Sequence, residues 1–220
     1  MQMRNNLIAS ALTDILINAA SGNPSGAVHL VLPKGMGGRG TCVQPGQCQK
    51  QTFSRGPDQR RKVLGSVLGN IGTFVDEKGH GVVSLVYSVM LSKGIEEMEA
   101  DFDFEISLIN EYGYASQELI NTMLVGRAAT NVHDGDKDMG EGLILKGINR
   151  QSEIGFLTLF EHHGYFEVGN YLKKPLVPIW IVCSESHYSI LFSTNIALAQ
   201  QQVSLNQRPF DIIYYDELAR

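Results

Sequence analysis

The feature that most constrains the fold is a change in the spacing of apolar residues along the chain. Over roughly the first 125 residues, apolar side chains recur mostly at helical intervals of three and four. After Tyr165 they gather instead in short runs rich in isoleucine, valine, tyrosine and phenylalanine, separated by turn-forming residues. Such runs are typical of antiparallel strands. Helices followed by strands indicate an α+β fold, with a helical N-terminal half and an antiparallel sheet in the C-terminal part.

Four helices are predicted in the first half. An apolar stripe marks the first helix, from Leu7 to Ala19. Two further stripes run over residues 63–71 and 82–90, and the second of these is assigned to a helix although it is rich in valine. The fourth helix, "ASQELINTMLVG", has Ser116 as its N-cap and Gly126 as its C-terminal stop.

Strands are predicted at several places outside these helices. The segment "GAVHLVLP", after the first helix, has the composition of a short strand. The segment "SEIGFLTLFEHH" is predicted as a fifth helix with Ser152 as its cap. Beyond it, four segments are predicted as strands: "YFEVGNYLKK", "VPIWIVCSE", "SHYSILFST" and "FDIIYYDEL".

Residues 34–59 break the pattern of the chain. They are rich in glycine, glutamine and arginine and contain a single acid, Asp58. A segment of this composition cannot supply a hydrophobic core, so it is predicted to be a disordered insertion. Its glycines suggest a phosphate-binding loop, but the string G-x-x-x-x-G-K-[ST] that such a loop requires does not occur in the chain.

Length, charge and hydropathy exclude several classes of protein. A chain of 220 residues is long enough for one domain with a real core. The net charge of −5 argues against a nucleic-acid-binding protein, because phosphate binding needs a surplus of lysine and arginine. The apolar runs are too short to predict a membrane span. The N-terminal segment has helical spacing and is interrupted by Asp14, so it is not interpreted as a secretory signal.

The cysteines and acidic residues do not predict a metal site or another cofactor. Three cysteines form no disulfide framework, which favours a reducing compartment, cytoplasmic or nuclear rather than secreted. Cys42 and Cys48 lack the second pair of ligands that zinc requires. The acids of "NVHDGDKDMGEG" alternate as in a calcium-binding loop, but Met139 and Leu145 stand where that loop needs glycine and glutamate. A solvated acidic turn is therefore predicted there.

Cys183 and His187 stand four positions apart in "CSESH" and raise the question of a thiol–imidazole pair. The segment predicts two strands joined by a tight turn, so the cysteine would lack the helix N-terminus that often lowers a thiol pKa. Cys183 is therefore interpreted as a small core residue. His187 remains open between a catalytic base and a hydrogen-bonded residue of the sheet. Cys42 and Cys48 are weak nucleophile candidates in the predicted loop.

Three long strings of the chain are distinctive: "GYASQELINTMLVGRAATNV", "SEIGFLTLFEHHGYFEVGNYLKKPLVPIWIVCSESHYSILF" and "FDIIYYDEL". These strings resemble the MINDY family of deubiquitinases, in the branch of its third and fourth human members. The resemblance runs from about Asp101 to Leu218 and continues more weakly over "ALTDIL" in the first helix.

The resemblance implies a papain-like cysteine protease fold and cleavage of lysine-48-linked polyubiquitin, with ubiquitin and its chains as partners. The family's general-base histidine falls on His187 of "ESHYSILF". The family's nucleophile lies in a Gly-Pro-Cys-Gly string, preceded by a glutamine, which should come before the helix that begins near Asn6. That string is absent from these 220 residues. The chain is thus expected to be a partial catalytic domain that is inactive by itself.

Three interpretations of the chain stay open at this point. It could be a fragment, a truncated gene product or a pseudoenzyme. Independently of its origin, three functions stay open: a deubiquitinase domain without its nucleophile segment, a non-catalytic ubiquitin-binding or scaffolding module, and an unrelated α+β domain in which His187 is a structural residue. The length of the matching strings argues against the third.

Overall fold

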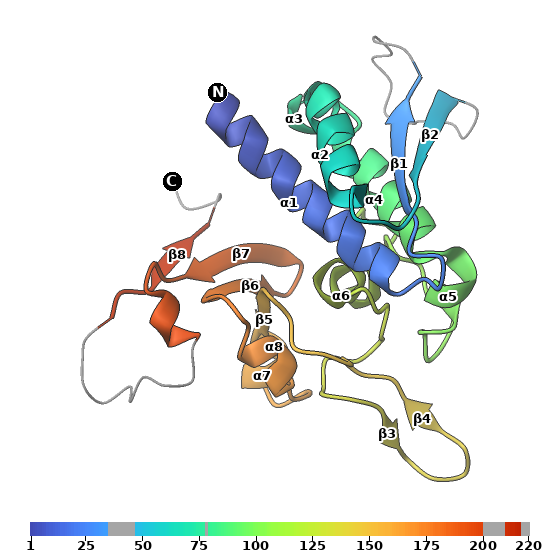
Figure 1. Cartoon of the computed structure of the whole chain (residues 1–220). Coiled ribbons are helices and arrows are strands. Elements are labelled where there is room, and N and C mark those ends of the chain that lie inside the picture. The colour runs from blue at the N-terminus through green and yellow to red at the C-terminus, as the bar shows by residue number, and fades with distance from the viewer. Residues whose placement is uncertain (35–46, 78, 200–209, 217–220) are drawn as a thin grey trace. The chain divides into compact units, whose positions relative to one another are not determined.

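The computed structural model describes residues 1–34, 47–77, 79–199 and 210–216. The chain divides into two compact units, Met1–Ala100 and Asp101–Arg220. The first unit is built from helices packed on a two-stranded ribbon, and the second from a four-stranded sheet with short helices (Figure 1). None of the helices in the described ranges is both long and apolar enough to cross a membrane.

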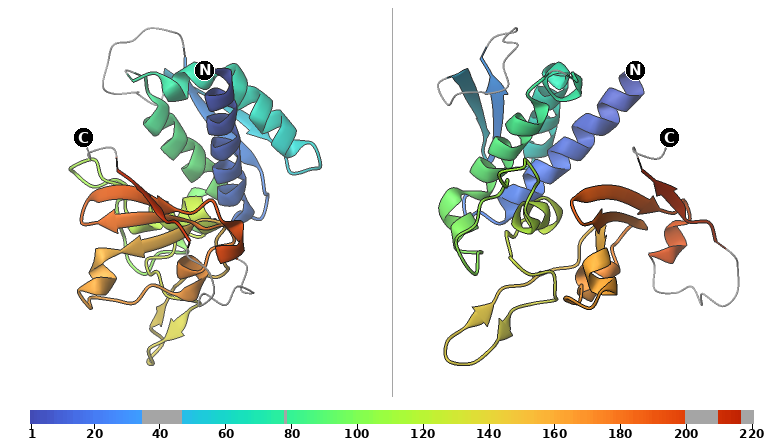
Figure 2. Two further views of the ribbon diagram at one scale, coloured as in Figure 1. Left: turned by 90° about the vertical axis from the view of Figure 1, so that its left-hand side faces the viewer. Right: turned by 180° about the vertical axis from the view of Figure 1, so that it is seen from behind.

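The first unit holds five helices and two strands among its described residues. The long helix α1 packs against α2 and α4, and α4 also covers β1 (Figure 2). The buried apolar side chains of α1 include Ala9 and Leu16, whereas Leu7 of the predicted stripe is exposed. The elements are α1 (Gln2–Ser21), β1 (Val28–Pro33), β2 (Cys48–Phe53), α2 (Gln59–Gly69), α3 (Ile71–Val75), α4 (Gly81–Lys93) and α5 (Ile95–Glu99).

Strand β2 corrects the prediction of a disordered insertion at residues 34–59. Strand β1 was predicted, and β2 pairs with it antiparallel over its whole length, from Val28 opposite Phe53 to Pro33 opposite Cys48. The glutamine-rich composition did not predict a strand, because the segment brings few apolar side chains of its own. Its backbone is instead fixed by hydrogen bonds to the apolar strand β1, a tertiary constraint that outweighs composition. Residues 35–46 of the predicted insertion, with Cys42, lie outside the described residues.

Helix α4 was predicted correctly, but the side that it buries was not. Its buried residues are mostly serines, together with Val89 and Lys93, while Val82 is 74% exposed. Two of the serines bind the backbone of β1. The Ser88 hydroxyl accepts a hydrogen bond from the Val31 N–H at 2.8 Å, and the Ser92 hydroxyl accepts one from the His29 N–H at 2.8 Å.

These two serines explain why a polar face of α4 is buried. A strand in a two-stranded ribbon has one edge without a strand partner, and burying its N–H groups unpaired would be costly. The serines supply acceptors at that edge of β1. Ser92 also donates to the His29 carbonyl at 3.2 Å, and Ser88 donates to the Ser84 carbonyl at 2.6 Å. The helix therefore takes the place of a third strand.

The second unit contains a four-stranded sheet in the order β5–β6–β7–β8. Strands β6, β7 and β8 are antiparallel neighbours, as predicted, but β5 pairs parallel to β6. The described elements are α6 (Gln117–Val125), β3 (Lys137–Asp138), β4 (Ile144–Leu145), β5 (Gly155–Thr158), α7 (Leu159–His162), α8 (Asn170–Lys173), β6 (Ile179–Ser184), β7 (His187–Phe192), the 3-10 helix η2 (Ile196–Leu198) and β8 (Ile213–Tyr215).

Two predictions of local structure in this unit were wrong. The expected fifth helix is strand β5 followed by the single turn α7. The segment from Tyr165 to Lys174, expected to be a strand, forms a loop and α8. Both errors have a tertiary cause. Strand β5 buries Phe156 beneath the sheet, and the start of α8 is fixed by the distant Asp134 carboxylate, which accepts hydrogen bonds from the N–H groups of Asn170 and Tyr171.

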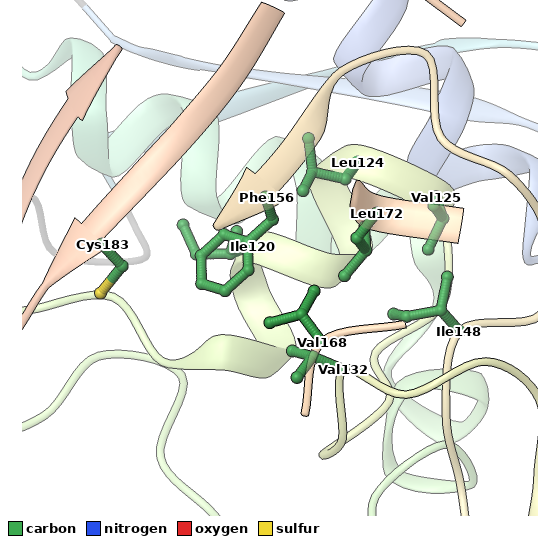
Figure 3. Packing of buried hydrophobic residues seen from close by; sticks show 9 residues of the cluster. All are labelled: Ile120, Leu124, Val125, Val132, Ile148, Phe156, Val168, Leu172 and Cys183. Atoms are coloured by element: carbon green, nitrogen blue, oxygen red, sulfur yellow. The ribbon is translucent and has the colours of Figure 1, made fainter. Parts of the chain in front are cut away.

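Helix α6 has the ends that the sequence predicted. The Ser116 hydroxyl accepts a hydrogen bond from the Leu119 N–H, and Gly126 adopts the left-handed conformation with φ 73°. The helix contributes Ile120, Leu124 and Val125 to the hydrophobic core of this unit. Figure 3 shows these side chains around Phe156 and Leu172, with Cys183 at the margin of the cluster. The core therefore joins α6 to the underside of the sheet.

A first prediction concerns the serine face of α4. Replacing Ser88 with Ala leaves the Val31 N–H buried without its acceptor, so the free energy of unfolding of the first unit should fall by about 1–3 kcal/mol. Hydrogen exchange at the Val31 amide should accelerate at the same time. Val82→Ala, on the exposed side of the same helix, should change stability by less than about 0.5 kcal/mol. Unchanged protection of Val31 in Ser88→Ala would contradict the role assigned to this hydroxyl.

A second prediction concerns the close approach of β5 and β6 at Gly155. A Cβ atom added to Gly155 would lie 2.7 Å from Nε1 of Trp180 and 2.6 Å from the Leu172 carbonyl oxygen. Gly155→Ala should therefore destabilise the second unit by about 1–3 kcal/mol through overpacking. It should also shift the fluorescence of Trp180, the single tryptophan of the chain. Gly65→Ala, in open space on α2, should leave that emission unchanged. An unshifted spectrum in Gly155→Ala would count against this packing.

Candidate functional site

The hairpin between β6 and β7 positions the histidine that the sequence singled out. The strands pair from Ile179 opposite Phe192 to Ser184 opposite His187. A two-residue turn joins them, and Glu185 in this turn has a φ of 55°. His187 is the first residue of β7, as the sequence predicted. Because it pairs with the last residue of β6, its side chain stands at the turn end of the hairpin.

The register of this hairpin places Cys183 and His187 on opposite faces of the sheet. Residues directly opposite one another across two strands share a face, and successive residues of a strand alternate. Cys183 is opposite Tyr188, and Ser184 is opposite His187. Cys183 therefore lies on the face that packs on the core, while His187 lies on the other face. The two residues do not form a thiol–imidazole pair, in agreement with the interpretation of Cys183 as a core residue.

The surroundings of Cys183 also disfavour a reactive thiolate. The side chain is buried, and Sγ donates a hydrogen bond to the Glu185 carbonyl oxygen at 3.3 Å. Burial raises the pKa of the Cys183 thiol, and hydrogen bonds with Tyr188 and Thr158 offset this only in part. Burial, together with the charge of Cys183, raises the pKa of Tyr188 to about 12. Both groups are therefore neutral at physiological pH.

His187 is accessible, and a carboxylate holds one of its ring nitrogens. Its side chain is 36% exposed, and Nε2 lies 2.8 Å from Oδ1 of Asp216, whose side chain is 16% exposed. The Tyr214 hydroxyl donates a hydrogen bond to Oδ2 of the same carboxylate at 3.3 Å. Among the described residues, none forms a hydrogen bond with Nδ1 of His187. This nitrogen is thus the one that could exchange a proton with a substrate or a nucleophile.

Strand β8 brings Asp216 to the histidine. Tyr214 pairs with Leu191 of β7, and Leu191 shares a face with His187 because the two are four positions apart on one strand. Asp216 follows Tyr214 by two residues and continues on that face. Sequence reasoning missed Asp216, because 29 positions separate it from His187. The one available signal was an acid placed directly after the "IIYY" run, but the register needed to interpret it is a property of the folded sheet.

Cys183 is the one cysteine among the described residues of the second unit, which carries His187. Cys48 begins β2 in the first unit, opposite Pro33, rather than lying in a loop. Cys42 lies outside the described residues. The His187 face of the second unit thus provides an imidazole with a carboxylate partner. Acid–base chemistry at a thiol would need a nucleophile from elsewhere.

The acidic turn is part of the framework and does not form a cation site. Asp134 caps α8, Asp136 forms a two-fold ion pair with Arg127 at 2.7 and 3.0 Å, and Asp138 accepts a hydrogen bond from the Gly140 N–H. The hydrogen bond from Arg127 lowers the pKa of Asp136. The three carboxylates are thus directed to three different partners. Within the described ranges, no group of three or more His, Cys, Asp or Glu side chains is arranged to hold a metal ion.

The whole chain matches one family model. Residues 1–220 match the conserved domain described as deubiquitinating enzyme MINDY-3/4. The chain is 46% identical over 145 residues to the probable ubiquitin carboxyl-terminal hydrolase MINDY-4 of Homo sapiens, an alignment covering 64% of this chain and 19% of that protein. It is 41% identical over 163 residues to the ubiquitin carboxyl-terminal hydrolase MINDY-3 of Homo sapiens, covering 72% of this chain and 35% of that protein.

The mouse relative gives a similar picture. The chain is 45% identical over 159 residues to the probable ubiquitin carboxyl-terminal hydrolase MINDY-4 of Mus musculus, covering 67% of this chain and 21% of that protein. The matched part is therefore a fifth to a third of these curated relatives. No solved structure matches the chain. The match of the family model over all 220 residues, supported by these identities, shows that the chain belongs to the MINDY-3/4 family.

Proposed function

We propose that this chain is the base-bearing part of a cysteine-type deubiquitinase, with His187 as the general base. The observation that carries the proposal is the position of His187 at the start of β7, with a side chain that is 36% exposed and with no described residue bound to its Nδ1. The family match and the names of the relatives as ubiquitin carboxyl-terminal hydrolases support it. The resemblance of the "ESHYSILF" string assigns the same residue.

The proposed reaction is acyl transfer through a thioester. His187 takes the proton of a cysteine thiol, and the thiolate attacks the carbonyl carbon of the isopeptide bond. The protonated imidazole then gives its proton to the departing lysine amine, leaving ubiquitin bound to sulfur. A water molecule, deprotonated by the same imidazole, hydrolyses the thioester and regenerates the thiol. We propose a papain-like arrangement for these groups, in which nucleophile and base come from different elements.

The nucleophile in this proposal comes from outside these 220 residues. The resemblance implies a Gly-Pro-Cys-Gly string at the start of a helix, with a preceding glutamine for the oxyanion hole, and the chain contains no such string. A helix N-terminus would lower the pKa of a thiol. Burial instead raises the pKa of the Cys183 thiol. The isolated chain is accordingly proposed to be inactive.

The proposed substrate is lysine-48-linked polyubiquitin, as the resemblance implies, and the proposed partners are ubiquitin and its chains. The proposed compartment is the cytoplasm or nucleus. Cys48 and Cys183 are free thiols, which suits a reducing environment. The match with ubiquitin carboxyl-terminal hydrolases supports ubiquitin as the group recognised, and the linkage is the feature that an assay with defined chains must test.

A second function is favoured by one specific observation. These 220 residues contain the proposed base, His187, but no Gly-Pro-Cys-Gly nucleophile string. A chain that works in this form would be a non-catalytic module that binds or scaffolds ubiquitin. Binding of lysine-48-linked chains together with inactivity after a nucleophile is supplied would select this second function over the first.

A third prediction concerns the chain by itself. It should not cleave lysine-48-linked tetraubiquitin, and a ubiquitin probe with a C-terminal electrophile should not label it, because Cys183 is buried on the face opposite His187. Gel assays of chain cleavage and intact-mass measurement of the probe adduct would check both. Labelling at Cys42, Cys48 or Cys183 that disappears in His187→Ala would show that the nucleophile lies within the chain.

A fourth prediction concerns a fusion that places the nucleophile segment of human MINDY-3 ahead of Met1. The fusion should cleave lysine-48-linked chains, and His187→Ala should lower kcat/KM by about 10²-fold or more, since general acid–base catalysis contributes at least that much. Two controls should retain activity: Cys183→Ala and His162→Ala, the latter at an exposed histidine of α7. Full activity of the His187→Ala fusion would remove His187 from the mechanism. Equal cleavage of other linkages would refute the proposed linkage preference.

A further inference from the structure

The Asp216 carboxylate is the one group among the described residues that forms a hydrogen bond with the His187 ring. The Nε2–Oδ1 distance of 2.8 Å is that of a strong, charge-assisted hydrogen bond. Both side chains are partly buried, with exposed fractions of 36% for His187 and 16% for Asp216. Water therefore competes less for this contact than for the ion pair between Arg60 and Asp14, whose side chains are 51% and 47% exposed.

Two neighbouring strands fix the geometry of this contact. The pairing of β7 with β8 sets Tyr214 beside Leu191 and continues toward Asp216 on the His187 face. The Tyr214 hydroxyl donates to Oδ2, the second oxygen of the carboxylate, at 3.3 Å. Oδ1 and Oδ2 thus have different partners, so rotation of the carboxylate away from the imidazole would break the contact with Tyr214 as well. The arrangement holds the acceptor oxygen at a defined place.

The chemistry of the two groups decides where the proton lies. An ionised carboxylate can only accept a hydrogen bond, so Nε2 of His187 must carry the hydrogen. The neutral ring then has its lone pair on Nδ1, the nitrogen that is open among the described residues. When Nδ1 takes up a proton, the adjacent carboxylate stabilises the positive charge of the ring.

We propose that Asp216 is a positioning residue for His187: it holds the Nε2–H tautomer and the ring orientation that present the Nδ1 lone pair to a nucleophile. The inference rests on the proposed function of His187 as the general base. It assigns Asp216 no contact with substrate. Tyr214 supports Asp216 in this role by holding Oδ2.

The tautomer can be measured on the 220-residue chain without any nucleophile. In chain labelled with ¹⁵N at histidine, the hydrogen-bonded Nε2–H of His187 should give a downfield, slowly exchanging proton resonance, with the ¹⁵N shift of Nδ1 in the unprotonated range. Asp216→Ala should abolish that proton resonance. The backbone amide spectrum of β6 and β7 serves as the check that the sheet is intact.

Matched variants distinguish loss of the His187–Asp216 hydrogen bond from loss of negative charge or of folded structure in general. Asp211→Ala removes another carboxylate from the segment before β8, and no described residue forms a hydrogen bond with that carboxylate, so the His187 resonance should persist. Tyr214→Phe should keep the resonance but speed its exchange, because the contact at Oδ1 remains while Oδ2 loses the Tyr214 hydroxyl. A His187 Nε2–H resonance that survives unchanged in Asp216→Ala with an intact sheet would overturn the inference. If Asp216→Ala does not fold, Asp216→Asn takes its place in the test, because the amide has the same size as the carboxylate and removes its charge.

The fusion with the human MINDY-3 nucleophile segment distinguishes failure of this inference from failure of the proposed function. If His187 is the base and Asp216 positions it, Asp216→Ala should lower kcat by about 10-fold or more with KM unchanged, as expected for a contribution made in the transition state. An active fusion with full kcat in Asp216→Ala would refute the positioning role and leave His187 as the base. An inactive wild-type fusion, with the Nε2–H resonance lost in Asp216→Ala, would instead refute the proposed function.

Discussion

The pairing of β6 with β7 is the constraint on which the candidate site depends. Ser184 opposite His187 and Cys183 opposite Tyr188 fix which side chains reach the core and which lie on the opposite face with His187. A slip of one residue would exchange the two faces, turning His187 toward the apolar core and Cys183 outward. The core contacts of Cys183 with Tyr188 and Thr158, and the hydrogen bond between His187 and Asp216, both select the observed register. Packing on one face thus fixes the chemistry available on the other.

Polar side chains stabilise both units, because the backbone N–H and C=O groups at a strand edge or a helix end need hydrogen-bond partners. Ser88 and Ser92 bind the free edge of β1, and Asp134 binds the first N–H groups of α8. Buried Lys93 donates to the Gly22 carbonyl at the C-terminus of α1, where a cation is favoured by the helix dipole. These serines, Asp134 and Lys93 are therefore structural, whereas His187 has a partly exposed ring with one nitrogen held by a carboxylate.

Parts of the fold could be predicted because their signals are local. The cap and stop of α6 at Ser116 and Gly126 require only a hydroxyl and a residue tolerant of positive φ at the correct spacing. Strands β6 and β7 are runs of β-branched and aromatic residues around a tight turn. The predictions failed where the deciding partner is distant in sequence. Strand β2 depends on β1, β5 depends on β6, and the buried serine face of α4 depends on the edge of β1.

The sequence by itself determined the family and the α+β class, because long strings carry enough information to match a family without a structure, and the string "ESHYSILF" singled out His187 as the candidate base. Whether Cys183 could serve His187, and which group holds its imidazole, was decided only by the tertiary structure. The hairpin register separates Cys183 from His187 although four positions divide them, and the β7–β8 pairing joins Asp216 to His187 across 29 positions. The physical reason is that strand side chains alternate between two faces, so proximity in a sheet follows register and not distance along the chain.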